Sequence, residues 1–101
     1  MRTLDNGSIE PVWARIRDRN SLDISAMATD IELAYGLESN EDAPVLGWEA
    51  PIDAEVLKPW LIRIAREVEA IRVGDDPTNY KLWARFGPGP TIKLLGKFRV
   101  Q

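Results

Sequence analysis

Apolar and polar side chains alternate along much of this chain, and this period of two is its most constraining feature. The clearest example is Tyr80–Phe86, where every second residue from Tyr80 onward is apolar. The intervening positions hold Lys81, Trp83 and Arg85. Because side chains of a β-strand point alternately to opposite faces, this segment is predicted to be a strand with one face in a core.

Three further segments fit the same pattern. Ile9–Arg17 and Ala28–Leu37 show the alternation, and Thr91–Val100 is predicted to return as a strand after the turn Gly87–Pro90. Gly96 interrupts the last segment, and a glycine inside a strand indicates a bulge or a close approach of another backbone. Turn sequences recur at short intervals along the chain, which favours several short strands over long helices.

Two segments are less clear. Val45–Ala50 is predicted to be a short strand that packs through Trp48. Ala54–Val73 fits both a strand and a helix, because its apolar residues also form a stripe at helical spacing. That stripe consists of Leu57, Trp60, Leu61, Ile64, Val68 and Ile71. The β-branched residues favour a strand for Trp60–Ala65, and a short helix stays an alternative for residues 66–73.

The composition argues against an enzyme. The chain has 101 residues, so residues 1–101 are expected to form one β-sandwich domain. It contains no cysteine and no histidine, which excludes disulfides, thiolate or imidazole catalysis and zinc sites built on those ligands. A domain this small rarely encloses the cleft that paired catalytic carboxylates need. We therefore expect no catalytic residue, no cofactor and no metal.

The same sequence predicts no membrane partner. No apolar run approaches the roughly 20 residues that a membrane helix needs. The first residues lack the apolar core of a secretory signal. We therefore expect the chain to be made in a cytoplasm and to stay out of the membrane.

Charge is distributed unevenly along the chain. Between Arg19 and Lys58 all charged residues are acidic, and after Asp76 all charged residues are basic. One interpretation is that opposite charges meet across neighbouring strands. The other is a dipolar surface through which copies dock on one another or on a charged partner. The net charge of −3 argues against nucleic acid as the main partner.

A turn that leads into a tyrosine narrows the fold class. Asp76 and Pro77 precede Tyr80, which opens the predicted strand. Immunoglobulin-like sandwiches place a tyrosine at this corner, with its hydroxyl bonded to backbone a few residues upstream. Leu82 stands two residues later, where antibody domains have a core cysteine. We therefore predict an all-β, immunoglobulin-like antiparallel β-sandwich.

Two clusters of tryptophan and cations are candidate protein-binding residues. Both fall on strand faces opposite the predicted core, where tryptophan and arginine are typical of interface hot spots. The alternative is that they only cover a half-buried sheet face. The candidates are Trp13, Arg15, Arg17, Lys81, Trp83 and Arg85.

The order of these elements resembles a known family. Five segments carry the resemblance, in this order along the chain: the opening Ser8–Val12, the strand Ile31–Tyr35, the segment Gly47–Glu49, the strand Tyr80–Arg85 and the closing basic strand Lys93–Val100. This order is similar to that of short immunoglobulin-like proteins encoded among the head and neck genes of tailed phages and prophages of actinobacteria. The segment Lys58–Val73 departs from their pattern, being longer and more helix-like.

The resemblance implies a function. It implies a non-enzymatic virion structural protein, forming a ring at the head-to-tail connection and contacting portal, adaptor, capsid or tail proteins. It also implies a homo-oligomer in the assembled particle, made in the cytoplasm of the host bacterium. An acidic middle and a basic end would supply the two unlike patches that a ring needs. The alternative is an immunoglobulin-like binding module of the tail or baseplate that grips a carbohydrate or host surface.

Overall fold

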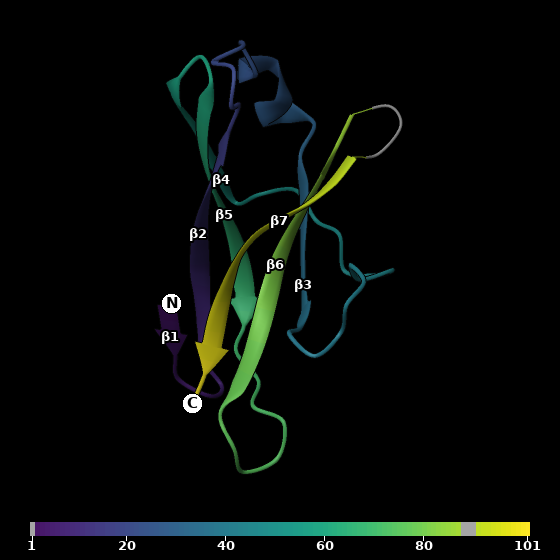
Figure 1. Cartoon of the computed structure of the whole chain (residues 1–101). Coiled ribbons are helices and arrows are strands. Elements are labelled where there is room, and N and C mark those ends of the chain that lie inside the picture. Colours follow the sequence, from purple (N-terminus) through teal and green to yellow (C-terminus); the bar gives the residue numbers. More distant parts are fainter. Residues whose placement is uncertain (1, 88–90) are drawn as a thin grey trace.

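The computed structural model describes residues 2–87 and 91–101, which form two β-sheets packed face to face (Figure 1). One sheet has the order β1-β7-β6-β3, and the other has the order β2-β5-β4. The elements are β1 (Arg2–Leu4), β2 (Ile9–Arg17), the 3-10 helix η1 (Ser25–Thr29), β3 (Glu32–Leu37), β4 (Asp53–Lys58), β5 (Leu61–Glu69), β6 (Thr78–Phe86) and β7 (Thr91–Val100). Residues 88–90 of the predicted turn after β6 lie outside the described residues.

This strand order confirms the predicted immunoglobulin-like sandwich. Strands β2, β5 and β4 correspond to the B, E and D strands of that fold, and β3, β6 and β7 correspond to C, F and G. All neighbouring pairs are antiparallel except β1 and β7, which run parallel. The sequence pattern missed β1, because three residues are too few to establish an alternation.

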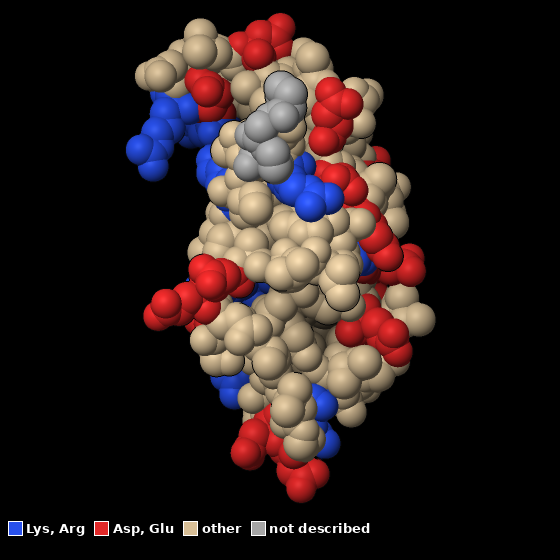
Figure 2. Space-filling model, turned by 90° about the vertical axis from the view of Figure 1, so that its right-hand side faces the viewer, with Lys and Arg blue, Asp and Glu red and all other residues tan. Residues whose placement is uncertain are grey.

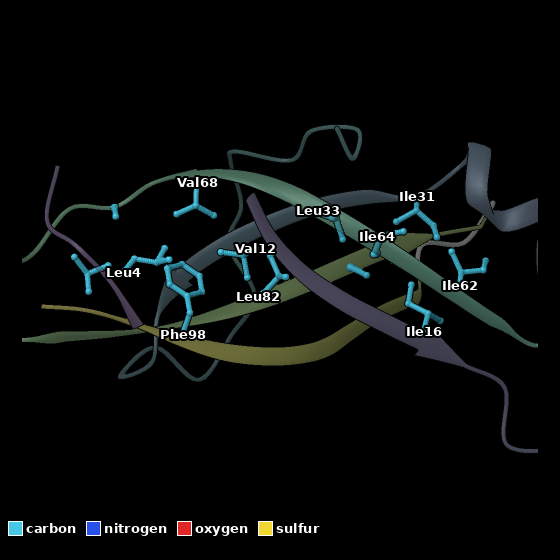
Figure 3. Packing of buried hydrophobic residues seen from close by; sticks show 13 residues of the cluster. Leu4, Val12, Ile16, Ile31, Leu33, Ile62, Ile64, Val68, Leu82 and Phe98 are labelled. Atoms are coloured by element: carbon cyan, nitrogen blue, oxygen red, sulfur yellow. The ribbon is translucent and has the colours of Figure 1, made fainter. Parts of the chain in front are cut away.

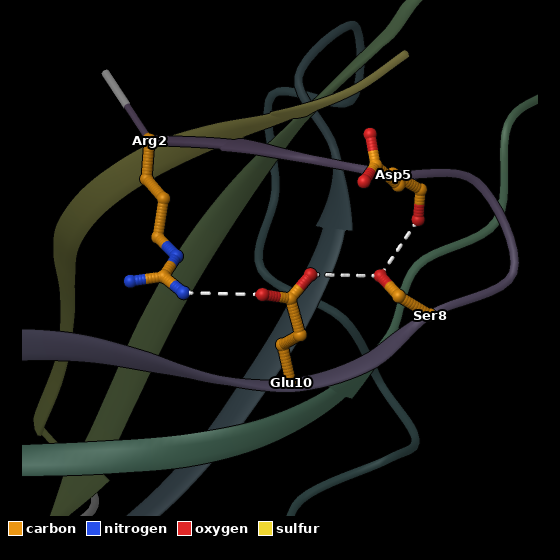
Figure 4. Close-up of polar contacts among 4 residues, drawn as sticks. All are labelled: Arg2, Asp5, Ser8 and Glu10. Carbon is orange, nitrogen blue, oxygen red and sulfur yellow. Dashed lines mark hydrogen bonds and ion pairs between the residues drawn. The ribbon is translucent and has the colours of Figure 1, made fainter.

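A polar cluster ties the two sheets together where β1 passes into β2 (Figure 4). Nη2 of Arg2 on β1 lies 3.3 Å from Oε1 of Glu10 on β2. The hydroxyl of Ser8 donates to the other oxygen of Glu10 at 2.8 Å. The turn between the strands closes through the Ser8 amide, which donates to the Asp5 carbonyl. Gly7 has a φ of +86° in this turn, a conformation that favours glycine.

The core lies between the sheets and is filled by alternate residues of the facing strands (Figure 3). Val12 and Ile16 of β2 face the interior, as the alternation predicted. Leu82, in the position of the core cysteine of antibody domains, is 1% exposed. The other fully buried large side chains are Phe98, Leu4, Ile31, Leu33, Ile62, Ile64, Val68 and Val100.

The helix considered for residues 66–73 is absent, and that alternative was wrong. Residues 66–69 continue β5 and pair with Ile9–Val12 of β2, while the amide of Ala70 donates to the carbonyl of Ser8. Backbone groups used in this ladder are not available for a helix. Residues 53–58 form β4, which meets β5 through the two-residue turn Pro59–Trp60. The helical stripe in the sequence was therefore coincidental.

Two strand predictions also need correction. The segment 28–31 is not extended, because the chain passes through η1, whose start is fixed by Asp23 accepting the Ser25 amide and hydroxyl protons. Val45–Ala50 is not a strand, and only Glu49 forms a bridge, with Leu33. The bulge predicted at Gly96 is present, since the β6-β7 register shifts there. No backbone approaches Gly96 closely.

The tyrosine corner is present. The hydroxyl of Tyr80 donates to the carbonyl oxygen of Ile71 at 2.6 Å, across the turn that joins β5 to β6. Its ring stacks on Phe98, with ring centroids 5.2 Å apart and planes 9° from parallel. Burial, with a smaller contribution from Tyr35, raises the pKa of the Tyr80 hydroxyl above its usual 10.0, so it stays a proton donor.

Tyr80→Phe is expected to lower the free energy of unfolding by about 1 kcal/mol, because it leaves the Ile71 carbonyl without its donor. Urea denaturation followed by tryptophan fluorescence measures this change. Tyr35→Phe is the matched control, since no described residue accepts a bond from the Tyr35 hydroxyl. Equal losses in the two variants would mean that the corner bond does not stabilise the fold.

Candidate docking site

The six predicted interface residues lie on two opposite outer faces and do not form one site. Trp13, Arg15 and Arg17 alternate with the buried Val12 and Ile16 of β2, so they lie on the outer face of the β2-β5-β4 sheet. The two sheets pack through their inner faces. Trp13, Arg15 and Arg17 are therefore separated from Lys81, Trp83 and Arg85 of β6 by the full thickness of the sandwich.

The second cluster lies on the outer face of the other sheet. Lys81, Trp83 and Arg85 alternate with the buried Leu82 and Ala84 of β6. Nζ of Lys81 lies 5.9 Å from the centroid of the Trp83 ring, within the range of a cation–π contact. These side chains are half-buried, so part of their surface is already used within the chain.

On the β2 face, a cation that the sequence pattern did not single out covers Trp13. The guanidinium carbon of Arg63 lies 3.9 Å from the centroid of the Trp13 ring. Arg63 is on the neighbouring strand β5, opposite Arg15, and also lies 3.9 Å from a carboxylate oxygen of Glu55 on β4. One face of the Trp13 ring is therefore occupied, which leaves less of it for a partner.

On the β6 face, the predicted cations hold the segment that joins β3 to β4, residues 38–52, here called the 38–52 loop. Nζ of Lys81 donates to the Asn40 carbonyl at 3.1 Å. The guanidinium of Arg85 lies 2.7 Å from a Glu32 carboxylate oxygen and 4.6 Å from the Trp48 ring centroid. Asn40 and Trp48 belong to the loop, so two of the predicted residues support it.

The 38–52 loop presents two adjacent apolar side chains to solvent. Val45 is 90% exposed and Leu46 is 83% exposed, more than any other large hydrophobic residue that the structure describes. We call this pair the apolar tip. Full burial of such a side chain is worth about 1.5–3 kcal/mol. Exposed apolar residues are ordinary when scattered singly, so this adjacent pair is a candidate contact surface.

Local contacts fix the shape of the loop on both sides of the tip. The indole Nε1 of Trp48 donates to the Pro44 carbonyl at 2.9 Å, which closes the loop around the tip. A Cβ on Gly36 would come within 3.1 Å of the Pro44 ring, so the glycine lets the proline pack directly on β3. Gly47 completes the turn with a φ of +84°. The tip is therefore presented by an ordered loop.

Arg66 holds the same loop from beneath. It is 7% exposed and is the one buried charged residue that the structure describes. Its Nε donates to the Leu33 carbonyl at 3.2 Å and its Nη2 donates to the Gly47 carbonyl at 3.1 Å. Its Nη1 donates to the Glu67 carbonyl and lies 3.1 Å from a Glu49 carboxylate oxygen. One side chain of β5 thus bonds β3 and the loop at once.

The charged residues of the 38–52 loop are all acidic. Figure 2, seen from the side of β3 and its loop, shows an uncharged central area with acidic side chains along both sides and basic side chains toward its upper and lower ends. Glu38 pairs with Lys97 of β7 at 2.7 Å, and this hydrogen bond lowers the pKa of Glu38. Glu41 and Asp42 form no ion pair with any described residue and line a hollow of about 550 Å³ beneath the tip. The loop therefore combines an apolar pair with free negative charge.

A second surface feature lies at the end of the sandwich, where η1 meets β2 and the β6-β7 hairpin. We call it the end pocket, a hollow of about 120 Å³. It is lined by Ile16, Arg17, Asp18, Ile24, Met27, Phe86 and Lys93. The Asp18 carboxylate accepts the backbone amide protons of Asn20 and Leu22, each at 2.9 Å. The end pocket therefore has apolar walls, two cations and one carboxylate, and this carboxylate is bonded to backbone amides.

The apolar tip and Arg66 were both missed by the sequence analysis. Val45 and Leu46 were assigned to a weak strand, although they stand between Pro44 and Gly47 in an otherwise acidic stretch. Two apolar residues between turn formers, without alternation, are a signal for an exposed loop. Arg66 gave no such signal, because its position among the inward-facing residues of β5 depends on the register with β2.

Two further findings concern residues 2–87 and 91–101, the described part of the chain. No helix there has the length and apolar character needed to cross a membrane. No group of three or more potential ligand side chains is placed to hold a metal ion.

Comparison with models of protein families, with characterised proteins and with solved structures found no match to this chain. The fold and the site define a class, an immunoglobulin-like sandwich with an apolar loop tip. The resemblance to phage head and neck proteins stays a prediction.

Arg66→Met is expected to lower the free energy of unfolding by about 2–4 kcal/mol, because the carbonyls of Leu33 and Gly47 lose a charged donor. Glu49→Gln is the matched control and should cost about 1 kcal/mol or less, since the Glu49 side chain is 66% exposed. Urea denaturation measures both. A loss in Glu49→Gln as large as in Arg66→Met would assign the stabilisation to the ion pair instead of the carbonyls.

The Glu38 carboxyl is expected to titrate below its ordinary pKa of 4.5, because Lys97 donates a hydrogen bond to its ionised form. Since the folded-state pKa is the lower one, the stabilisation is present above the unfolded pKa and is lost as the pH falls through the folded pKa. Side-chain NMR during a pH titration measures the value. Lys97→Gln should raise it, and an unchanged pKa in that variant would contradict the assignment.

Proposed function

We propose that this chain is a non-enzymatic structural protein of a virion, which docks on other proteins of the particle through its apolar tip. The observation that supports this proposal best is the exposure of Val45 and Leu46 on a loop held by Trp48, Pro44 and Arg66. Such a loop loses little conformational freedom on binding, which leaves more of the burial energy for affinity.

The position in the particle that we propose is the head-to-tail connection. The resemblance of the sequence to head and neck proteins supports it. Its partners would be the portal, adaptor, capsid or tail proteins, and further copies of the chain in a ring. The acidic 38–52 loop and the basic residues of the last two strands supply unlike surfaces, as ring contacts require.

Binding of a carbohydrate or host surface is less well supported. A sugar ring stacks on an open aromatic face, and Arg63 covers one face of Trp13 at 3.9 Å. Trp83 is half-buried and lies near Lys81. Neither tryptophan therefore offers the open platform that such binding would use.

Mass spectrometry of purified virions from the source tests the proposal. A connector ring surrounds a single axis, so about a dozen or fewer copies per particle are expected. Hundreds of copies would contradict the neck position and indicate capsid decoration. Failure to find the chain in the particle would contradict the virion role.

The same particles test the apolar tip. The double variant Val45→Ser with Leu46→Ser should fold normally, because exposed positions change stability by only about 0.5 kcal/mol, and it should be lost from the particle. Ile9→Ser with Val73→Ser is the matched control, since these residues are 66% and 60% exposed and lie outside the loop. Normal incorporation of the tip variant would show that docking uses another surface.

A further inference from the structure

The apolar tip and the end pocket have matching chemistry. The tip offers Val45 and Leu46 beside the carboxylates of Glu41 and Asp42. The end pocket offers apolar walls beside the cations Arg17 and Lys93, while its one carboxylate, Asp18, accepts backbone amides. The tip belongs to the loop that follows β3, whereas the end pocket is lined by Ile24 and Met27 at η1. Figure 1 shows this loop and η1 in different places of the fold. These are two different surfaces of one molecule.

We propose that the apolar tip of one copy inserts into the end pocket of a second copy. This inference rests on the proposed docking function and identifies one partner of the tip as this chain itself. Leu46 would enter the end pocket, with Glu41 and Asp42 facing Arg17 and Lys93. Each copy then gives a tip to one neighbour and receives a tip from another.

The dimensions agree with a single inserted side chain. The end pocket has a volume of about 120 Å³. A protein cavity of about 150 Å³ accommodates a benzene molecule, so the end pocket suits one aliphatic side chain. Its walls of Ile16, Ile24, Met27 and Phe86 are apolar. Insertion would remove apolar surface of both partners from water, which is the main driving force of association.

The charges add specificity to this contact. Arg17 and Lys93 form no ion pair with any residue in the described part of the chain, and the same holds for Glu41 and Asp42. These four charged groups therefore have no ion-pair partner among residues 2–87 and 91–101 of the same copy. Complementary charges at the rim of an interface set its register and raise the association rate.

The contact is heterologous, because a tip meets a pocket and not a second tip. Repetition of such a contact gives a closed ring or an open chain of copies, depending on the rotation between neighbours. A two-residue tip buries far less area than a stable dimer interface needs. We therefore expect weak association of the isolated protein, which other virion proteins would reinforce in the particle.

Engineered cysteines test the contact directly, because the natural chain has none. A Leu46→Cys variant is mixed with a Met27→Cys variant under mild oxidation. The proposal predicts a mixed disulfide between the two variants, formed roughly ten times faster than in a control pair without contact. The control pairs Leu46→Cys with Val73→Cys, whose position is exposed and lies away from the end pocket.

Charge reversal provides the second arm of the experiment. Adding Glu41→Lys and Asp42→Lys to the Leu46→Cys partner should slow the mixed disulfide to the control rate. Adding Arg17→Glu and Lys93→Glu to the Met27→Cys partner should restore it. Rescue of this kind requires that the two pairs face each other, so a mere loss of folding in one variant cannot imitate it.

NMR of the unmodified protein gives an independent measurement. At concentrations up to about 1 mM, the methyl signals of Val45, Leu46, Ile24 and Met27 should shift with concentration. The shifts should vanish in the Val45→Ser, Leu46→Ser double variant. Two outcomes would overturn self-docking. One is that the methyl signals do not shift with concentration and the mixed disulfide forms at the control rate. The other is that the Leu46→Cys variant forms disulfides mainly with other copies of itself. Incorporation of the chain into particles would be unaffected by that result, so failure of the inference and failure of the proposed function are distinguishable.

Discussion

The arrangement of this protein depends on one buried guanidinium. Arg66 projects from β5 into the sandwich, where a charge is costly unless its donors are satisfied. The carbonyls of Leu33 and Gly47 and the carboxylate of Glu49 satisfy them. These partners come from β3 and from the loop that follows it. The need to pair one charge thus joins both sheets to the loop that presents the apolar tip.

The rest of the fold follows from the alternation of inward-facing and outward-facing side chains along the strands. Residues of β2, β5, β6 and β7 point alternately inward and outward, and the inward set forms one core. The tyrosine corner bonds across the turn from β5 to β6, and the Arg2–Glu10 pair links β1 to β2. Two of the outward residues predicted to form an interface, Lys81 and Arg85, contact the 38–52 loop. The surface that we propose for docking is therefore the apolar tip of the loop, and these residues support it.

Sequence reasoning succeeded where a feature is local. The alternation in Ile9–Arg17, the bulge at Gly96 and the role of Tyr80 each depend on neighbours in the chain, and all three are confirmed. Sequence reasoning failed where contacts with a distant part of the chain decide the local structure. Residues 66–69 have a helical stripe but pair with β2, and the tip departs from strand structure because Pro44 packs on Gly36. In the candidate site, the sequence analysis identified Lys81 and Arg85, which contact the loop, but not Val45 and Leu46, which form its apolar tip.

The parallel pairing of β1 with β7 has a consequence for how copies of this protein can join. Because β1 belongs to the other sheet, β2 is an edge strand of its own sheet along its whole length. Pro11 has no amide proton to offer there, and Arg15 and Arg17 place positive charge along the same strand. Proline and charge on a marginal strand discourage the addition of a foreign strand. A second copy is therefore hindered from adding a strand to β2, which is the kind of contact that builds a fibre. An assembly that grows from this edge has to use side-chain contacts instead.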